Sequence, residues 1–427
     1  MIAGGWPGDS SFLELTGQKV DLTFYYSGSY PGSPEAVSLA STTSHAFTPI
    51  IQSPRGHLTF LYPRLRQALD GLQPDVIHVV SEPWGLLCVQ AARWVRANPQ
   101  SRLVIHGCDT IWHHGGALEQ RARKILLRST MGVVAAYCAE NSKALALAAQ
   151  NGLSASSIRA RIHTCPRNDS LWRPPQPVER ARARAALNLP DDVFAVGMLG
   201  RLVPQKGVLM FLDAAEALFQ RDFPARFFVA GDGPLKEEVI RRRSDYVVPL
   251  NSLPHPHGVL QFLHALDLLC CPSLSTRSWE DQGPRSVLEA MMCGCIPVAT
   301  PTGGISEMLA GHGVLSQSVD STSFADAIVE AAVSARDQEV RHDISIWAGA
   351  QYSDRAVAQQ LVDLWHRVAA MQQEATATEG LSGTSTKRRI GRLRWIGSRL
   401  AWNHLADVRA TPKVAKHTTQ KSTRQPK

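Results

Sequence analysis

The chain has 427 residues, of which 44% are hydrophobic and 19% charged, and this composition is typical of globular proteins. This length exceeds one ordinary core and predicts two or three domains. The formal net charge is +8, but residues 387–427 contain twelve lysines and arginines and only one acid. Residues 1–386 therefore carry 33 basic and 36 acidic residues, a net charge of −3 that argues against a nucleic-acid-binding core.

The eight cysteines form no C-x-x-C pair and fall mostly within apolar runs. They indicate buried, reduced thiols rather than a zinc site or a disulfide framework. No apolar run approaches the ~18 residues of a membrane-spanning helix, and residues 1–15 lack the basic start and apolar stretch of a secretion signal. We therefore expect a cytoplasmic protein, attached at most to the inner face of a membrane.

Short β-branched runs alternate with helical patterns in the first half of the chain. They predict strands at 20–26, 74–80, 102–106 and 132–136 and helices at 84–97 and up to Ala149. A proline-rich segment at 166–177 follows and is the candidate linker.

The same alternation returns in the second half. It predicts strands at 194–199, 225–230, 266–271 and 296–300, helices at 207–220 and 284–293, and closing helices at 324–336 and 354–371. The whole pattern predicts an α/β fold with two doubly wound, Rossmann-like domains facing across a cleft. The expected parts are a first Rossmann-like domain at 1–168, a second at 169–350, a closing helix at 351–372 and a disordered basic tail at 373–427.

The loop at 200–207, G-R-L-V-P-Q-K-G, follows a predicted strand and opens a predicted helix. Such a junction offers free backbone N–H groups and the positive end of a helix dipole, and both suit a phosphate. Gly200 starts this loop, and Arg201 and Lys206 add two cations. The alternative for this segment by itself is a solvated basic loop.

Acidic residues lead from a second loop into a helix at 279–294. Asp281 and Glu289 are eight residues apart with Pro284 near the helix start, so one carboxylate can lie in the loop and the other about a turn inside the helix. Carboxylates at these two points, with Glu280 beside the first, can each accept a pair of sugar hydroxyls. Taken alone, Glu289 is equally well a charge on an exposed helix face.

A glycine pair, Gly303 and Gly304, follows the next predicted strand, where backbone can approach a ligand closely, although such a pair is usually only a turn. In order and spacing, residues 194–315 resemble the donor-binding domain of glycosyltransferase family 4, which has the GT-B fold. The matching segments are G-R-L-x-x-x-K-G at 200–207, V-A-G-D-G-P at 229–234, L-D-L-L-x-x-P-S at 266–273, the acid-x7-acid segment ending L-E-A-M-M-C-G at 288–294, and P-V-A-T-x-x-G-G-x-x-E at 297–307.

The resemblance implies a role for each matching residue. Arg201 and Lys206 would hold the donor diphosphate and stabilise the leaving group, and Glu289 would bind the nucleotide ribose. Asp281, or Glu280 shifted by one, would contact hydroxyls of the transferred sugar, where the family usually has Glu. The sequence contains no D-x-D motif, so we expect neither a metal nor another cofactor.

The first half of the chain resembles the family less closely. Pro74-Asp-Val-Ile-His78 is similar to a strand of its other domain, and Leu103-Val-Ile-His-Gly-Cys-Asp109 to its V-x-H-G-x-D segment. His106 would then be the acceptor-side active-site histidine, whereas a strand-end histidine by itself is usually structural. The family begins with a full strand and a Gly-Gly loop that contacts the diphosphate. Here Met1 stands three residues before Gly4, so either that strand is missing or the loop is built differently.

These observations favour a retaining glycosyltransferase that moves a hexose-type sugar from a nucleotide-diphosphate donor to a glycan, lipid-linked or small-molecule acceptor. The alternatives are a sugar-nucleotide-binding protein without transfer activity and a nucleic-acid-associated protein that uses the basic tail, although we expect no nucleic-acid partner. Residues 387–405 show helical spacing with an apolar side, opposed arginines and two tryptophans. Such a helix suits an anionic membrane surface, whereas the alternative is a solvated tail without a partner.

Overall fold

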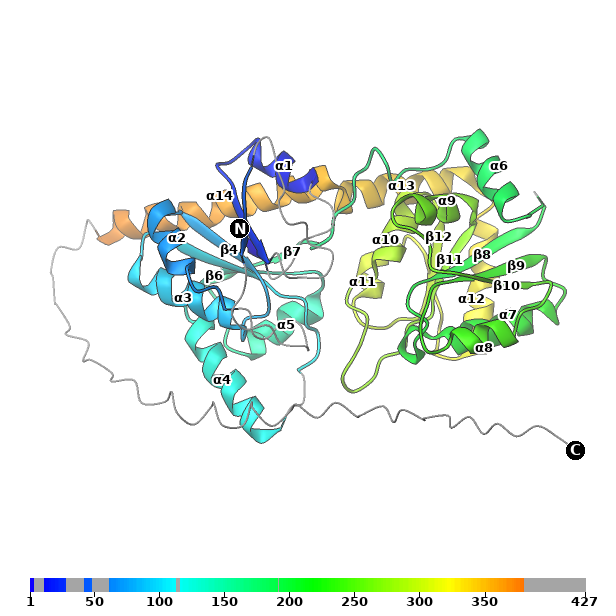
Figure 1. Ribbon diagram of the computed structural model, residues 1–427, viewed down its shortest axis with the longest axis horizontal. Helices are drawn as coiled ribbons and strands as arrows, with labels where there is room; N and C mark the ends of the chain where they lie inside the picture. Colours follow the sequence, from blue (N-terminus) through cyan, green and yellow to red (C-terminus); the bar gives the residue numbers. More distant parts are fainter. Residues whose placement is uncertain (4–10, 28–41, 48–60, 113–115, 191, 380–427) are drawn as a thin grey trace, which may run out of the picture. The chain divides into compact units, whose positions relative to one another are not determined.

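The computed structural model describes residues 1–3, 11–27, 42–47, 61–112, 116–190 and 192–379. Met1–Ala377 form one compact unit. This unit contains two sheets of parallel strands, each with helices between its strands (Figure 1). The predicted α/β fold with two parallel sheets is confirmed.

The N-terminal sheet has the strand order β3-β2-β1-β4-β5-β6-β7 among the described residues. Its strands are β1 (Ile2–Ala3), β2 (Thr23–Ser27), β3 (Thr43–Phe47), β4 (Val76–Val80), β5 (Arg102–His106), β6 (Val134–Ala139) and β7 (Ile158–Arg161). The first strand is only two residues long, yet it lies between β2 and β4, where Ile2 pairs with Tyr25 and with Val79. Gly4 lies outside the described residues.

Helices cover both faces of this sheet. They are α1 (Ser11–Gly17), α2 (Leu65–Leu72), α3 (Leu86–Ala97), α4 (Ala117–Met131) and α5 (Ser142–Gln150). Apolar side chains of α2, α3, α4 and α5 form one core with the sheet. A second core contains side chains of α1 together with those of the last described helix, α14 (Asp354–Glu379). The chain therefore returns at its end to complete the domain with which it starts.

Helix α14 begins at the predicted residue but runs beyond the predicted end at 371. The residues after 371 include alanines and glutamates, which extend an existing helix at little cost. Val357, Leu361, Leu364 and Val368 recur at helical spacing, and all four are buried in the second core. This spacing is the apolar face that attaches the helix to the sheet.

The C-terminal sheet has the order β10-β9-β8-β11-β12-β13. Its strands are β8 (Phe194–Leu199), β9 (Ala225–Ala230), β10 (Val247–Leu250), β11 (Leu268–Cys271), β12 (Ile296–Ala299) and β13 (Val314–Leu315). Its helices are α6 (Pro177–Ala186), the 3-10 turn η1 (Pro204–Lys206), α7 (Val208–Phe219), α8 (Lys236–Arg241), α9 (His257–Ala265), α10 (Arg285–Met292), α11 (Ile305–Leu309), α12 (Ser321–Ser334) and α13 (Gln338–Tyr352). The strand order reverses between β8 and β11, which are hydrogen-bonded neighbours.

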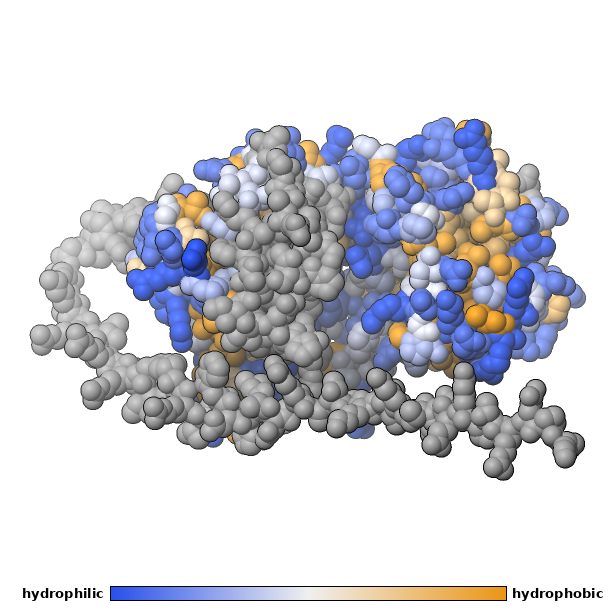
Figure 2. Space-filling view, in the orientation of Figure 1, coloured by the Kyte–Doolittle hydropathy of each residue, from blue (hydrophilic) through white to orange (hydrophobic). Residues whose placement is uncertain are grey.

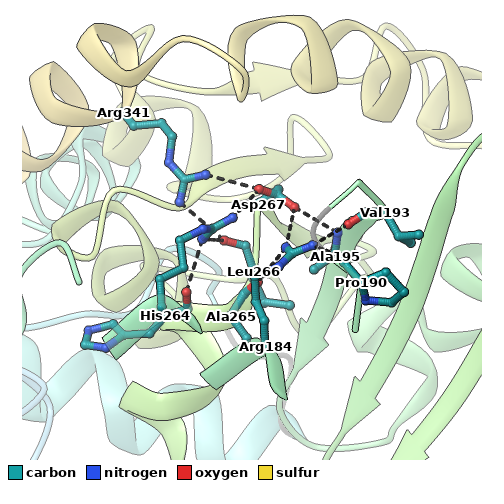
Figure 3. A network of polar contacts seen from close by, with 10 residues as sticks. Arg184, Pro190, Val193, Ala195, His264, Ala265, Leu266, Asp267 and Arg341 are labelled. Carbon is teal, nitrogen blue, oxygen red and sulfur yellow. Dashed lines mark hydrogen bonds and ion pairs between the residues drawn. The ribbon is translucent and has the colours of Figure 1, made fainter. Parts of the chain in front are cut away.

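A buried carboxylate fixes the amino-terminal edge of this sheet (Figure 3). Asp267 directly precedes β11 and accepts hydrogen bonds from Arg180 at 2.6 Å, Arg341 at 3.2 Å and Arg184 at 3.4 Å. The backbone N–H of Ala195 donates to the same carboxylate at 2.9 Å. Because several donors compensate the buried charge, this network attaches α6 and α13 to the sheet. It lies at the opposite end of the strands from the site described below.

The surface of the described residues is mostly hydrophilic on the face in Figure 2, with smaller hydrophobic patches. Among the described helices, none is both long and apolar enough to cross a bilayer. All eight cysteines are free thiols, and six of them are buried. The prediction of buried, unpaired thiols is thus confirmed for those six, while Cys108 and Cys165 are partly exposed.

Candidate functional site

The carboxyl ends of β8 and β11 bring the two predicted donor-binding loops together. Because the strand order reverses between these neighbours, the loops leave in opposite directions and open a crevice between them. The loop after β8 carries Arg201 and Lys206, and the loop after β11 starts at Pro272. Gly207 joins them: its φ is +68°, and a Cβ there would lie 1.8 Å from the Pro272 carbonyl oxygen. Only glycine allows this approach.

Lys206 is held beside the first predicted acid. Its Nζ donates to Asp281 Oδ2 at 2.6 Å and lies 5.4 Å from the centre of the Trp279 ring. The Ser273 hydroxyl also donates to Asp281 Oδ2. Asp281 is buried, so the hydrogen bonds from Lys206 and Ser273 compensate the cost of removing its carboxylate from water. The structure thus pairs two residues that the sequence assigns to different parts of the donor.

Arg201 is exposed, and its guanidinium makes no hydrogen bond or ion pair with the part of the chain that the structure describes. It lines the same cavity as Lys206 and Asp281. A guanidinium without an internal partner is available to a phosphate, which it can bind through two parallel hydrogen bonds. Arg201 is therefore the group here that is best placed to accept an anionic ligand.

The cavity at these loops has a volume of about 290 Å³. Its walls come from the C-terminal half through Arg201, Lys206 and residues 278–283, and from the N-terminal half through residues 109–111 and Glu140. Cations and carboxylates thus line one space. Such a space suits a ligand that carries both negative charge and hydroxyl groups.

Glu280 lines the cavity with a side chain that is only 8% exposed, and it forms an ion pair with Lys143 at 3.1 Å. The glycine pair packs beneath this acidic loop. A Cβ at Gly303 would lie 1.7 Å from the Asp281 carbonyl oxygen, and one at Gly304 would lie 2.0 Å from the carbonyl oxygen of Gln282. The packing of the acidic loop by itself therefore requires both glycines, and the predicted contact of this pair with a ligand stays a prediction.

Glu289 is buried on α10 and does not line the 290 Å³ cavity. Its Oε1 accepts a hydrogen bond from Arg167 Nε at 2.7 Å and lies 3.1 Å from His255 Nε2. The His255 side chain is half exposed, whereas Arg167 and Glu289 are both 4% exposed. The structure thus excludes the alternative of an exposed helix-face charge, and the half-exposed His255 lies between Glu289 and the solvent-accessible surface.

His106 ends β5 in a buried position and does not line the cavity. Its Nε2 lies 2.9 Å from the Ile162 carbonyl oxygen, and its ring stacks on His78, whose Nδ1 accepts a hydrogen bond from Trp365. Burial lowers the pKa of His106 to about 4, so the ring is neutral at neutral pH. The catalytic role assigned to His106 therefore stays a prediction.

Two further carboxylates, Asp109 and Glu140, line the cavity on the N-terminal side, and Glu82 lies beside Asp109. Glu82, which follows β4, accepts hydrogen bonds from the backbone N–H groups of Cys108 at 2.7 Å and Asp109 at 3.0 Å. It thereby holds the loop after β5 and presents Asp109 to the cavity. Burial, together with the charge of Asp109, raises the pKa of Glu82 to about 8. Glu140 follows β6 and lines the cavity directly.

Two groups of described residues bring possible metal ligands within 4.8 Å of one another. One group is His78, His106 and Cys138 in the core; the other is Glu82, Cys108 and Asp109. In the first, each ring uses one nitrogen in the contacts given above, and burial raises the pKa of the Cys138 thiol. In the second, Glu82 Oε1 already accepts three hydrogen bonds, including one from the Cys108 thiol. Each group still contains one buried atom that makes no hydrogen bond with the described residues, His78 Nε2 in the first and Glu82 Oε2 in the second.

Several residues of this region were not predicted from the sequence. Glu140 directly follows a strand whose predicted end, at 136, lies three residues before the observed end, so an acid at a strand's carboxyl end could have identified it. Ser273 directly follows the P of the matched P-S segment. Arg167 lies in the segment 166–177, which the sequence indicates only as a linker, and His255 lies in a loop for which no role is predicted. Nothing in the sequence indicates that these two contact Glu289.

Comparisons with known proteins agree with this arrangement. The family described as "Glycosyl transferases group 1" matches residues 193–333, and the "Glycosyl transferase 4-like domain" matches residues 13–162. The D-inositol 3-phosphate glycosyltransferase of Corynebacterium urealyticum is 30% identical over 228 residues, which are 48% of this chain and 51% of that protein. A putative teichuronic acid biosynthesis glycosyltransferase of Bacillus subtilis is 33% identical over 129 residues, 30% of each chain. The chain thus spans about half of the first relative and less than a third of the second.

Solved structures share the fold over most of the chain. HepE of Anabaena in complex with UDP has a TM-score of 0.64 at 19% identity, covering 86% of this chain and 98% of that one. The sucrose-phosphate synthase of Thermosynechococcus elongatus has a TM-score of 0.63 at 16% identity, covering 87% and 99%. At these identities the likeness shows the fold. The two family matches place the chain in the glycosyltransferase group 1, GT4-like family, and the solved structures show that it has the GT-B fold.

Proposed function

We propose that the chain is a retaining glycosyltransferase that moves a sugar, of hexose type, from a nucleotide-diphosphate donor to a hydroxyl acceptor without a metal ion. One observation carries the proposal: Arg201, Lys206 and Asp281 line one cavity at the point where the strand order of the C-terminal sheet reverses. In the proposed function, the two cations bind the diphosphate of the donor and the carboxylate binds its sugar.

The chemistry of glycosyl transfer needs this combination. When the bond between the sugar and the diphosphate breaks, negative charge develops on the leaving phosphate and positive charge on the sugar ring. Preorganised cations stabilise the first charge, and removing one such group typically costs about 3 kcal/mol of barrier. Arg201 and Lys206 supply these cations, so the leaving group needs no metal ion. The leaving phosphate then helps to deprotonate the incoming hydroxyl on the same face of the sugar, which retains the configuration.

Structures with the same fold support the donor class. HepE of Anabaena has been solved with UDP, with UDP and glucose, and with UDP-glucose. We therefore propose a nucleotide sugar such as UDP-glucose as the donor. The names of the relatives point to different acceptors, so they do not identify the acceptor of this chain.

A direct assay tests the proposal. Purified protein is incubated with UDP-glucose, UDP-N-acetylglucosamine or GDP-mannose and a mixture of sugars and polyols, with and without EDTA. We expect nucleotide release that depends on both substrates and survives EDTA, and a product whose anomeric configuration by NMR matches that of the donor. Loss of activity in EDTA, or an inverted product, would contradict the proposed mechanism.

The second candidate is a sugar-nucleotide-binding protein without transfer activity. The engagement of Asp281 with Lys206 and Ser273 favours it, because a carboxylate with internal partners is less available to a sugar. The same assay separates the two candidates. Donor affinity by calorimetry without any transfer or donor hydrolysis would support binding alone.

A further inference from the structure

Glu140 keeps one carboxylate oxygen without a hydrogen-bond donor at the cavity wall. Its side chain is 8% exposed and lines the cavity. Oε1 accepts hydrogen bonds from the backbone N–H of Thr164 at 3.2 Å and from the Thr164 hydroxyl. Oε2 lies 4.0 Å from His163 Nε2 and accepts no hydrogen bond from the described residues. Because this oxygen lies at the cavity wall and receives no donor from the described residues, a donor group of a ligand can bind there.

Gly283 leaves that oxygen uncovered. A Cβ at position 283 would lie 2.9 Å from Glu140 Oε2 and 3.3 Å from His163 Nε2. Any other residue would therefore press on the carboxylate from the side of the cavity that Gly283 lines. His163 Nε2 is itself buried and makes no hydrogen bond within the described chain. Glu140 Oε2 and His163 Nε2 therefore both lie next to Gly283 at the cavity wall.

The carboxyl group of Glu140 is ionised at neutral pH. Burial alone would raise its pKa, but the neighbouring His163 and the hydrogen bonds from Thr164 outweigh this and hold the pKa of Glu140 below its ordinary value. An ionised carboxylate accepts hydrogen bonds and donates none. It therefore binds hydroxyl and ammonium groups and repels phosphate and carboxylate groups.

Asp109 places a second carboxylate on the same side of the cavity. Two hydrogen bonds hold Asp109 in place. Its backbone N–H donates to Glu82 Oε1, and Gln282 Nε2 donates to its Oδ1 at 3.4 Å. The cations among the described lining residues are Arg201 and Lys206, and both come from the loop after β8. The N-terminal wall of the cavity, as far as the structure describes it, therefore contains two carboxylates and no cation.

We propose that Glu140, together with Asp109, binds the acceptor through its hydroxyl or amino groups, and that the acceptor carries no phosphate or carboxylate at this point. The inference rests on the proposed function, because that function assigns Arg201 and Lys206 to the donor diphosphate. It deepens that function by naming the class of acceptor: a neutral or amino-bearing sugar or polyol rather than an anionic one.

The test uses the full chain and acceptors in matched pairs. Glucose is compared with glucose 6-phosphate and myo-inositol with its monophosphate, and glucosamine is added as the amino-bearing member. The donors are UDP-glucose, UDP-N-acetylglucosamine and GDP-mannose, and nucleotide release above the acceptor-free rate is measured. We expect neutral or amino-bearing acceptors to have a kcat/KM at least tenfold above that of their phosphate esters. A phosphate ester used as well as its neutral partner, or donor hydrolysis without use of any neutral acceptor, would overturn the inference.

Two variants test the residues themselves. Glu140→Gln removes the charge, and Gly283→Ala covers Oε2, so each should raise the KM for the acceptor at least tenfold while the donor Kd by calorimetry changes less than threefold. Gly349→Ala is the matched control, because a Cβ there meets nothing within 4 Å; it should change neither value. An unchanged acceptor KM in both cavity variants would overturn the inference. If the wild-type chain neither binds nor hydrolyses any of the donors, the proposed function fails first, and this result is distinct from a reversed acceptor preference.

Discussion

Lys206 Nζ lies 2.6 Å from Asp281 Oδ2, so the cation predicted to hold the diphosphate and the carboxylate predicted to hold the sugar are hydrogen-bonded to each other. Both side chains are largely buried, at 19% and 10% exposed. Without a ligand, each therefore compensates the charge of the other. A donor that binds here must place its phosphate beside Lys206 and its sugar hydroxyls beside Asp281. A variant of each residue should therefore affect a different part of the donor.

The first prediction concerns Lys206→Ala. Because the variant removes a preorganised cation from the leaving phosphate, turnover should fall by about two orders of magnitude, which corresponds to ~3 kcal/mol of barrier. Asp281 keeps the hydrogen bond from Ser273, so the fold should remain intact by circular dichroism. Turnover close to wild type in a folded variant would show that Lys206 does not serve the diphosphate.

The second prediction concerns Asp281 and Glu289, which are assigned to different parts of the donor. Asp281→Asn should weaken binding of the sugar nucleotide more than that of the free nucleotide, because Asp281 is assigned to the sugar. Glu289→Gln should weaken both ligands by about 1.5–3 kcal/mol, the usual cost of losing a charged acceptor. Calorimetry with UDP and UDP-glucose measures all four affinities. Equal losses for both ligands in both variants would mean that the roles are wrongly divided.

The third prediction concerns the buried pair of Arg167 and Glu289, whose atoms Nε and Oε1 are 2.7 Å apart. Arg167→Met leaves a buried carboxylate with His255 as its remaining side-chain partner among the described residues, and breaking such a pair typically costs about 3–5 kcal/mol of unfolding free energy. The double variant Arg167→Met with Glu289→Leu removes both charges and should regain most of that loss. Urea unfolding measures the free energy of unfolding of wild type, of Arg167→Met and of the double variant. A double variant no more stable than Arg167→Met would show that the pair does not explain the loss.

The fourth prediction concerns pH and Glu82. Burial and the charge of Asp109 raise the pKa of Glu82 from 4.5 to about 8 in the folded chain. The protonated form is thus favoured by folding, so its contribution is complete below the unfolded pKa and is lost as the pH rises through about 8. Glu82→Gln mimics the protonated acid and has no proton to lose. Between about pH 5 and pH 9, wild type should lose on the order of 3 kcal/mol relative to this variant in urea unfolding. Parallel stability profiles of the two proteins would contradict the shift.

The sequence predicted those strands whose apolar, β-branched runs stand between clear breaks. β5, β8 and β9 begin and end at the predicted residues. The strands that were missed are short or mixed in character, such as β13 with two residues and β7, where arginines alternate with apolar residues. Their existence depends on a neighbouring strand to which they can bond, and no local pattern records that neighbour.

Residues of the candidate site could be proposed from the sequence only where one continuous segment carries a recognisable pattern. The loop containing Arg201 and Lys206 could be recognised because it joins a strand to a helix. The contact between Arg167 and Glu289 could not, since it depends on the chain returning near Ser353, with which Arg167 forms an isolated bridge. The open oxygen of Glu140 is equally invisible, because it results from a glycine that lies far away in the sequence.

The last prediction concerns the basic tail, whose segment 387–405 lies outside the described residues. Ile390, Leu393, Ile396 and Leu400 recur at helical spacing, and Trp395 and Trp402 are seven residues apart. A basic amphipathic helix with tryptophan at its margin suits the surface of an anionic bilayer, where each lysine or arginine contributes about 1 kcal/mol. Several such contributions together hold a protein reversibly, and salt weakens them.

We therefore expect full-length protein to sediment with vesicles of phosphatidylserine and phosphatidylcholine at low salt and to be released at high salt. A chain ending at Glu379, the last residue of α14, should remain in the supernatant and keep its donor affinity, because the core contacts of that helix lie between Val357 and Val368. A variant with Arg388, Arg392 and Arg399 changed to Gln separates charge from length, and it should bind the vesicles weakly although the tail is complete. Equal partitioning of the full-length and shortened chains would show that the tail is not a membrane anchor, and the basic residues would then be only a solvated end of the chain.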